Sequence, residues 1–446
     1  MAAQLVSYDP SNGEKVGEVT VTPISDIDGV VAKARVAAKE WGALDVNKRV
    51  ELITKALAGI EPDSEKFAVL LSREMGKDLR RSSGEMRWVI GGGVGNAQSA
   101  RQALATRELA DGSLLQYRPL GVVAVISPWN YPVAMANNLI IPALVAGNTV
   151  VFKPSEETPL IADAYVKKLN IVLPEGVLQI IHGDGQQGAA VVESDVDMIA
   201  FTGSQATGKK IMERASGTLK RLVMELGGND PLIIMADADL EHAAQFAVAN
   251  SFENAGQMCI ATERIYVDDS IADIFEKRVV EIAGEYTVGP WDQQGVNIGP
   301  IINARQHEKI VAHIRDAEAK GARVLLGGSD QPQRYIKPTV ICEVTPEMLL
   351  ETEETFGPVV AISRYSDIEE AIEKANNTNY GLGSVVFGGE DANKVADRLE
   401  AGMVGVNSGV GGGVDAPWVG AKQSGFGFHG SADGHRQFAQ VRVVSR

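Results

Sequence analysis

The sequence predicts an α/β protein with a parallel sheet, and three observations carry this prediction. A chain of 446 residues is long enough for two or three domains of ordinary size. From Leu120 onward, short β-rich runs alternate with helical stretches, which is the pattern of βαβ units. Earlier, residues 27–43 place Val30, Ala34 and Trp41 on one stripe, so an amphipathic helix is expected there. We expect successive strands at Val122–Ile126, Thr149–Phe152, Val177–Ile181, Met198–Phe201 and Leu222–Leu226.

A second α/β region is expected to begin after the adjacent glycines Gly227–Gly228. Leu240–Val248 carries apolar residues at helical spacing. A further helix is expected over Gln306–Lys320, because a glycine follows it, and the strand Val324–Leu326 comes next. The chain shows no internal repeat, and its one glycine-rich stretch, Gly409–Gly413, is expected to be a loop.

The composition excludes several classes of protein. The formal net charge of −16 repels a phosphate backbone, so nucleic acid is not expected as a partner. No apolar run reaches the ~20 residues of a membrane span, and Met1–Asn12 lacks the features of a secretory signal. Two cysteines make no disulfide framework, so we expect a cytoplasmic protein. The histidines show no HExxH or paired Cys/His spacing, and no metal site is expected.

Cys259 and Glu225 are the first candidate pair for catalysis. Cys259 ends the segment FENAGQMC, whose glycine allows a turn that presents the thiol to a cleft. Glu225 ends the apolar run RLVME, and the two glycines that follow leave room beside its carboxylate. A nucleophile and a general base are therefore both available. The alternative is that Cys259 is a small buried hydrophobic residue, but Cys342, in the β-branched run PTVICEV, fits that description better.

Three further motifs follow predicted strands, at the carboxyl ends where parallel sheets bind nucleotides. In PWNYP, the amide of Asn130 is placed either to donate to an oxyanion or to cap the next helix. In FKPSEETP, Lys153 and Glu156 are placed to reach ribose hydroxyls, and the alternative is a solvated loop. FTGSQATG (Phe201–Gly208) suits either a pyrophosphate at a helix N-terminus or an ordinary tight turn.

Together these segments resemble the aldehyde dehydrogenase family in order and spacing over nearly the whole chain. The resemblance rests on PWNYP, FKPSE, FTGS, MELGG, GQMC, EETFGPV (Glu353–Val359) and PWVGAKQSGFG. It implies that Cys259 is the nucleophile, that Glu225 is the general base, and that Asn130 forms the oxyanion hole with the backbone N–H of Cys259. It also implies a cofactor site made of Trp129, Lys153, Glu156, Gly203, Ser204, Gly227, Glu354 and Phe356.

The resemblance also implies a domain organisation. Residues 1–105 and 120–227 would form a Rossmann-like NAD-binding domain, and residues 228–425 an α/β catalytic domain. Residues 106–119 and 436–446 would form a small β oligomerisation element that pairs subunits into a homodimer or homotetramer.

The implied reaction is the NAD-dependent oxidation of a small-molecule aldehyde. A thiolate adds to the aldehyde, hydride leaves, and Glu225 activates the water that hydrolyses the thioester to a free acid. NAD is expected as the cofactor, with NADP as the alternative, because the carboxylate of Glu156 repels a 2′-phosphate. A coenzyme A-acylating relative would need no such base, and a catalytically silent paralogue would lack some of the chemical groups present here.

The substrate funnel departs from the carboxylate-selective members of the family. Those members carry arginines shortly after the PWN motif and six residues before the nucleophile, where this chain has Asn138 and Glu253. A carboxylate-terminated substrate is expected to meet repulsion, so neutral or amino-aldehydes are expected over the alternative, succinate semialdehyde. Arg264 is expected to brace the structure rather than to bind substrate. The remaining funnel residues are expected to be Tyr131, Met135, Met258 and Trp418.

Overall fold

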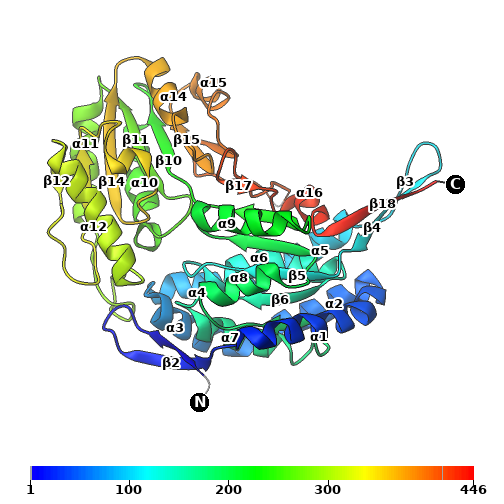
Figure 1. Cartoon of the computed structure of the whole chain (residues 1–446). Helices are drawn as coiled ribbons and strands as arrows, with labels where there is room; N and C mark the ends of the chain where they lie inside the picture. The colour runs from blue at the N-terminus through cyan, green and yellow to red at the C-terminus, as the bar shows by residue number, and fades with distance from the viewer. Residues whose placement is uncertain (1–2, 414, 446) are drawn as a thin grey trace.

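Two large sheets organise the computed structural model of the chain, which describes residues 3–413 and 415–445 (Figure 1). One sheet has six strands and the other has seven, and parallel pairing dominates both. The predicted α/β class is therefore confirmed. Two smaller sheets complete the fold: a hairpin of β1 (Gln4–Tyr8) and β2 (Lys15–Thr20), and a three-stranded sheet near the C-terminus.

The six-stranded sheet is buried on both faces. All five residues of β5 (Val122–Ile126) are buried, as expected for a parallel strand covered by helices on each side. Alternate residues face opposite layers, so Val123 packs into one core and Val122 into the other. The strands, in sheet order, are β17 (Gly425–Phe426), β9 (Arg221–Glu225), β8 (Met198–Thr202), β5, β6 (Thr149–Lys153) and β7 (Leu178–Ile180).

The order of the strands along the chain reverses within this sheet between β5 and β8. Strands β6 and β7 lie on one side of β5, whereas β8 and β9 lie on its other side. Such a reversal opens a crevice at the carboxyl ends of the two strands, where α/β proteins bind ligands. Ser127 and Thr202 mark those ends.

Helices cover both faces of the six-stranded sheet. The buried stripe of helix α1 (Ile24–Ala43) contains Ile27, Val31, Ala34 and Trp41. Val31 therefore occupies the core position for which the sequence favoured Val30. One face is covered by α1 (Ile24–Ala43), α8 (Gly185–Glu193) and α9 (Gln205–Ser216); the other is covered by α2 (Val46–Ala58), α5 (Gly93–Ala103), α6 (Pro132–Val145) and α7 (Pro159–Leu169), with α3 (Ser64–Met75) and α4 (Leu79–Arg87) packed beside them.

The seven-stranded sheet forms the second α/β region, drawn at the upper left of Figure 1. Cys342 lies in its strand β13 and is fully buried, as predicted. The strands, in sheet order, are β12 (Arg323–Leu326), β13 (Thr339–Cys342), β14 (Val359–Tyr365), β11 (Thr262–Asp268), β10 (Asp230–Ile234), β15 (Gly383–Phe387) and β16 (Met403–Val406). The helices of this region are α10 (Leu240–Phe252), α11 (Ala272–Gly284), α12 (Ala304–Ala319), α13 (Leu349–Thr352), α14 (Ile368–Asn376) and α15 (Ala392–Ala396).

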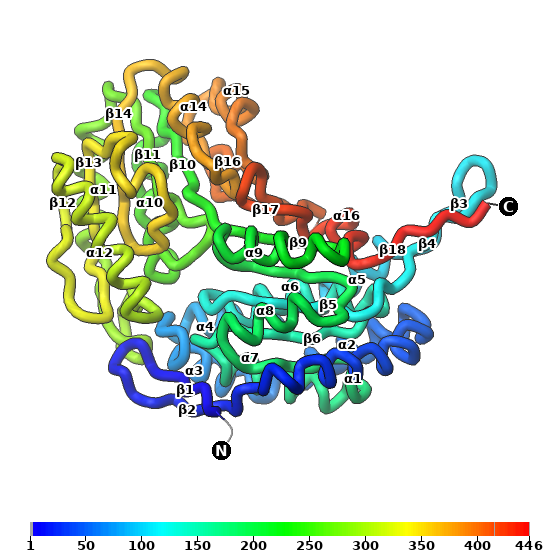
Figure 2. Tube along the Cα trace, in the orientation of Figure 1, coloured from blue at the N-terminus to red at the C-terminus, as the bar shows by residue number. Residues whose placement is uncertain are grey.

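The C-terminal segment returns from the seven-stranded sheet to the six-stranded one, as the red tube in Figure 2 shows. Its strand β17 pairs antiparallel with β9, and Gly425 lies opposite Glu225. The short helix α16 (Ser431–Arg436) then packs against α5.

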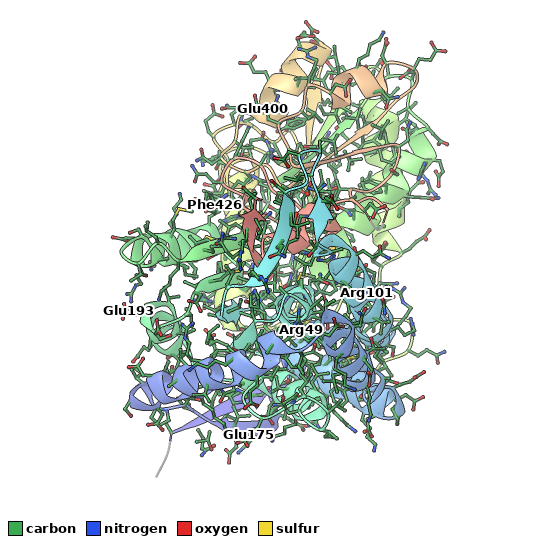
Figure 3. The ribbon with its side chains drawn as sticks, turned by 90° about the vertical axis from the view of Figure 1, so that its right-hand side faces the viewer. Arg49, Arg101, Glu175, Glu193, Glu400 and Phe426 are labelled. Atoms are coloured by element: carbon green, nitrogen blue, oxygen red, sulfur yellow. The ribbon has the colours of Figure 1, made fainter. Side chains whose placement is uncertain are left out.

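The three-stranded sheet projects from the body of the molecule and faces the viewer in Figure 3. It is formed by β3 (Arg107–Glu108), β4 (Leu114–Pro119) and β18 (Ala439–Val444), with β4 in the middle. Within the described residues, no helix combines the length and the apolar character needed to cross a membrane.

Candidate active site

The loop that carries Cys259 makes a left-handed turn directly before the thiol. Asn254, Ala255 and Gly256 all have positive φ, at 53°, 58° and 70°. A left-handed conformation costs about 1–2 kcal/mol for a residue such as alanine, so other contacts must hold the turn. Gln257 supplies two of them, because its Nε2 donates to the carbonyl of Asn254 (3.1 Å) and its Oε1 accepts from the N–H of Ile302 (2.9 Å). The nucleophile loop is therefore fixed by side-chain amides.

Asn130 points at this loop. Its side chain is buried, and its Nδ2 donates to the carbonyl of Gln257, two residues before Cys259, at 3.0 Å. The second N–H of the amide stays available for an oxyanion. The helix-capping alternative is wrong, because Glu85 caps α6 instead: its Oε1 accepts from the N–H groups of Val133 and Ala134, at 3.1 Å each.

Lys77 and Glu85 form a buried ion pair beneath Asn130, which the sequence analysis missed. Lys77 Nζ lies 2.7 Å from Glu85 Oε2 and donates to the carbonyl of Asn130 at 2.6 Å. The same ammonium lies 3.7 Å from the centre of the Tyr131 ring. Burial lowers the pKa of Lys77, and the charge of Glu85 opposes that effect. The pair therefore holds the backbone from which the amide of Asn130 projects.

The electrostatics around Cys259 keep its sulfur protonated at rest. Burial raises the pKa of this thiol to about 12, and the carboxyl groups of Asp230 and Glu354 add to the effect. The residue still keeps part of its surface exposed. At neutral pH the resting group is therefore the neutral thiol.

Gly227 and Gly228 lie between β9, the strand of Glu225, and β10, and they pass close to Cys259. A Cβ added at Gly228 would lie 2.5 Å from the carbonyl oxygen of Cys259, and one at Gly227 would lie 2.4 Å from Glu354 Oε1. The N–H of Gly228 donates to that same oxygen at 3.1 Å. Only glycine allows the chain to pass this closely between Cys259 and Glu354.

Glu225 has an unexpected neighbour, His429. The Nε2 atom of His429 lies 2.7 Å from Glu225 Oε1, and both side chains are buried. The pairing of β17 with β9 brings the two residues together, and the N–H of Trp418 donates to the carbonyl of His429 at 2.9 Å. Sequence reasoning missed His429 because it matches no metal or catalytic spacing; the only available signal was a histidine two residues after the motif KQSGFG.

Polar groups collect at the carboxyl ends of β5, β6 and β8. Lys153, the last residue of β6, is buried and lies 3.2 Å from Glu156, which is partly exposed. Ser204 caps the N-terminus of α9 by accepting from the N–H of Thr207. Gln205 Nε2 is buried and has no hydrogen-bond partner among the described residues. A strand edge with a lysine, a carboxylate and a helix N-terminus fits a nucleotide.

Trp129 and Phe356 extend this group of residues toward the nucleophile. Their rings meet edge to face, with centroids 5.6 Å apart. Phe356 has a positive φ of 58°, and Glu263 holds this turn by accepting from the N–H groups of Thr355 and Phe356 at 2.6 and 2.7 Å. Burial raises the pKa of both Glu263 and Glu354.

Glu253 is paired with Arg81, a partner that the sequence did not indicate. Arg81 donates from Nε and Nη2 to the two carboxylate oxygens of Glu253, at 2.8 Å each. The hydroxyl of Tyr131 contacts the same carboxylate at 3.4 Å and lies 4.0 Å from the sulfur of Met258. Sequence spacing missed Arg81 because it precedes Glu253 by 172 residues. The charge of Glu253 is therefore largely offset by Arg81.

The remaining predicted funnel residues are held in different ways. Asn138 is buried on α6, and its Oδ1 accepts from Asn96 at 3.3 Å. Trp418 is partly buried in the C-terminal segment. Arg264 is fully buried and donates to the carbonyls of Asn229, Lys374 and Ala375, so it braces the structure, as predicted.

Comparisons with known proteins agree with this arrangement. The family model described as "Aldehyde dehydrogenase family" matches residues 2–444. A probable succinate-semialdehyde dehydrogenase (NADP(+)) of Sinorhizobium fredii is 35% identical over 98% of this chain and 91% of its own length. The peroxisomal aminoaldehyde dehydrogenase 1 of Pisum sativum is 34% identical over 99% of this chain and 92% of its own.

A solved structure supports the same assignment. Aldehyde dehydrogenase C of Pseudomonas syringae, crystallised as a cysteine-to-alanine variant with NAD+ and octanal, superposes with a TM-score of 0.94. It is 32% identical, and the match covers 99% of this chain and 93% of that one. The motifs, the fold and these relatives lead to one conclusion: the chain belongs to the aldehyde dehydrogenase family and is an oxidoreductase that acts on an aldehyde.

Proposed function

We propose that this protein oxidises an aldehyde to the carboxylic acid with NAD, through a covalent intermediate on Cys259. The observation that carries the proposal is the packing of two elements onto the Cys259 loop. The amide of Asn130 bonds to this loop, and Gly228 lies directly against the carbonyl of Cys259. Nucleophile, oxyanion donor and the strand of a general base thus converge on one loop.

The cofactor would lie at the carboxyl edge of the six-stranded sheet. Lys153 and Glu156 would hold the adenosine ribose, and the N-terminus of α9, with Ser204, would meet the pyrophosphate. When bound, the nicotinamide supplies the acceptor for the hydride. The predicted cofactor site also contains Trp129, Gly203, Gly227, Glu354 and Phe356; Glu354 would hold a ribose, and Phe356 would pack near the nicotinamide ribose.

NAD is favoured over NADP by the charge of Glu156. Its side chain is partly exposed beside Lys153, so its carboxylate would repel a 2′-phosphate. The Sinorhizobium fredii relative is named for NADP(+), and NADP is therefore the alternative cofactor.

The chemistry begins at the sulfur. The Cys259 thiol gives its proton to solvent, and the sulfur adds to the aldehyde carbon, which forms a thiohemiacetal with an oxyanion. Asn130 Nδ2 and the backbone N–H of Cys259 would stabilise that oxyanion, and a single donor of this type can contribute about 2.7–4 kcal/mol. Collapse of the oxyanion expels hydride and leaves a thioester on Cys259.

Glu225 would complete the turnover. It takes a proton from water, the oxygen attacks the thioester carbon, and the carbon–sulfur bond breaks to release the acid. Transfer to coenzyme A would need no such base, so the presence of Glu225 favours hydrolysis over the coenzyme A-acylating alternative.

For the substrate, a neutral or amino-aldehyde is proposed. Tyr131, Met258 and Trp418 would supply an apolar and aromatic funnel, and an aromatic face attracts an ammonium group. Succinate semialdehyde is the second candidate, because Arg81 offsets the charge of Glu253 and weakens the repulsion of a carboxylate.

The organisation of the chain is also proposed by resemblance. Residues 1–105 and 120–227 would bind the cofactor and 228–425 would carry the catalytic loop. Strand β18 lies at an open edge of the three-stranded sheet and exposes Val441 and Val443, so it is proposed to pair subunits into a homodimer or homotetramer.

The proposal is tested by NADH formation with butanal, 4-aminobutanal and succinate semialdehyde at equal concentration. Wild type should reduce NAD with at least one of them, and Cys259→Ala should not. Cys342→Ala is the matched control, because it removes a buried thiol in β13 and should retain activity. Substantial NADH formation by Cys259→Ala would exclude the assignment.

A further inference from the structure

His429 is the single ionisable partner of Glu225 among the described residues. Its Nε2 atom lies 2.7 Å from Glu225 Oε1, within hydrogen-bond distance. That oxygen is buried, and no hydrogen bond of good alignment reaches it from any described residue. The contact thus joins the proposed general base to a side chain that the mechanism above does not use.

His429 is uncharged in this position. Burial lowers the pKa of His429 to about 3, and the neighbouring His435 on α16 acts in the same direction. Burial also lowers the pKa of His435, to about 4. Both imidazoles are therefore neutral near pH 7. A neutral imidazole still carries one N–H and can donate it to a carboxylate.

Among the described residues, the polar contact recorded for the imidazole of His429 is the one with Glu225. Its backbone is held separately, since the carbonyl of His429 accepts from the N–H of Trp418 at 2.9 Å.

We propose that His429 is a positioning residue that donates from Nε2 to Glu225 Oε1, keeps Glu225 ionised and leaves its other oxygen free to take the proton from water. This inference rests on the proposed function and deepens it. A hydrogen bond to the charged form of a carboxylate favours ionisation, and at a buried carboxylate this support matters most because burial alone favours the neutral acid. Without His429, Glu225 would hold its proton to a higher pH and would be a poorer base.

The role can be measured on the hydrolysis step alone. Cys259 is acetylated with p-nitrophenyl acetate: the ester carbon–oxygen bond breaks, p-nitrophenolate leaves, and an acetyl thioester forms on sulfur. Excess reagent is removed, and mass spectrometry follows the loss of the acetyl group from pH 5 to pH 9. This assay contains no hydride-transfer step, so it reports directly on Glu225 and its surroundings.

Two substitutions at position 429 separate positioning from packing. His429→Leu removes both ring nitrogens, whereas His429→Gln keeps an N–H donor close to the position of Nε2. We expect His429→Leu to slow deacetylation about 10- to 100-fold at pH 7, the range for a hydrogen bond to a charged group. The acid limb of its pH profile should move upward by about one to two pH units, and His429→Gln should restore most of the rate and the wild-type limb.

His182→Leu is the matched control. His182 is also buried, and its Nε2 lies 3.3 Å from a carboxylate, that of Asp163, but it belongs to the loop after β7. The His182→Leu variant should lose its acetyl group at the wild-type rate. The proposal is overturned if His429→Leu deacetylates at the wild-type rate with the wild-type limb, or if both substitutions at 429 slow the step equally with no shift of the limb.

Failure of the proposed function gives a different result. If p-nitrophenyl acetate leaves Cys259 of wild type unmodified, or if Glu225→Gln deacetylates like wild type, the nucleophile or the base has been misassigned, and the inference fails with it. If wild type is acetylated on Cys259 and Glu225→Gln deacetylates slowly, the substitutions at position 429 test the role of His429 alone.

Discussion

The guanidinium of Arg81 binds both carboxylate oxygens of Glu253 at 2.8 Å each, at the point where the chain leaves α10 for the nucleophile loop. A second carboxylate, that of Asp78, also contacts Arg81. The ionised cluster of these three residues carries one net negative charge, and Tyr131 contacts its Glu253 side. The substrate that this funnel accepts should therefore depend on whether Glu253 keeps its charge.

Glu253→Gln should move substrate preference toward carboxylates. Arg81 would then be balanced by Asp78 alone, and the cluster would become neutral. Two charges about 4 Å apart at an effective dielectric near 20 interact by about 4 kcal/mol, so a strongly screened effect still changes kcat/KM about tenfold. We expect kcat/KM for succinate semialdehyde to rise relative to 4-aminobutanal, with butanal as the neutral reference.

The control for this substitution is Glu241→Gln. Glu241 also makes a two-point ion pair, with Arg278 at 2.7 and 2.9 Å, but at the opposite end of α10. Its loss should leave the ratio of the three substrates unchanged. A wild-type enzyme that prefers succinate semialdehyde, or a ratio that Glu253→Gln does not alter, would contradict the charge argument.

Lys77→Met should weaken both the fold and the catalytic step. The substitution leaves Glu85 as an unpaired buried carboxylate and frees the carbonyl of Asn130, so unfolding should become easier by about 3–5 kcal/mol. Urea titration measures the loss, and kcat should fall because the oxyanion donor is held less firmly. Lys15→Met, which breaks an exposed ion pair with Glu18, should change neither quantity appreciably. Equal stability of the two variants would show that the buried pair does not support this site.

Glu156→Gln should narrow the preference for NAD over NADP. The variant loses the negative charge beside Lys153 that would repel a 2′-phosphate. The ratio of kcat/KM with NAD to kcat/KM with NADP should therefore fall about tenfold. Glu157→Gln is the adjacent control, because that carboxylate accepts from Asn303 at 2.7 Å. A wild type that already prefers NADP, or a ratio that is the same in both variants, would argue against the assigned role of Glu156.

Alkylation of Cys259 should keep accelerating as pH rises. Because the pKa of this thiol is raised to about 12, the thiolate fraction should grow about tenfold per pH unit throughout the range from 7 to 10. The measurement uses iodoacetamide on Cys342→Ala without cofactor, so that a single thiol is followed. A rate that levels off near pH 8 would mean that the resting thiol is far more acidic than its surroundings indicate.

The sequence predicted the sheet better than it predicted the site. The strands at residues 122–126 and 198–202 were recognisable because β-branched runs fully buried in a parallel sheet differ clearly from the helices between them. Strand boundaries moved by about one residue: the strand expected at Leu222–Leu226 is Arg221–Glu225. The local pattern of apolar residues is sufficient to predict a strand where the burial of that segment determines its structure.

The partners of the site residues could not be predicted in the same way. Cys259, Asn130 and Glu225 stand in motifs, whereas Arg81, Lys77 and His429 reach the site only through tertiary packing. The pairing of Arg81 with Glu253 spans 172 residues, so no spacing rule contains it. Lys77 lies in the loop between α3 and α4, where its sequence neighbours do not indicate that it is buried.

The central claim is that Cys259 carries the acyl group and Glu225 releases it, and the thioester itself is the most direct evidence. Glu225→Gln is mixed with butanal and NAD, quenched in acid within seconds and digested for mass spectrometry. The account predicts one burst of NADH, little further turnover, and a butanoyl adduct on the peptide that contains Cys259, with the peptide of Cys342 unmodified. Full turnover without an adduct, or an adduct elsewhere in the chain, would contradict it.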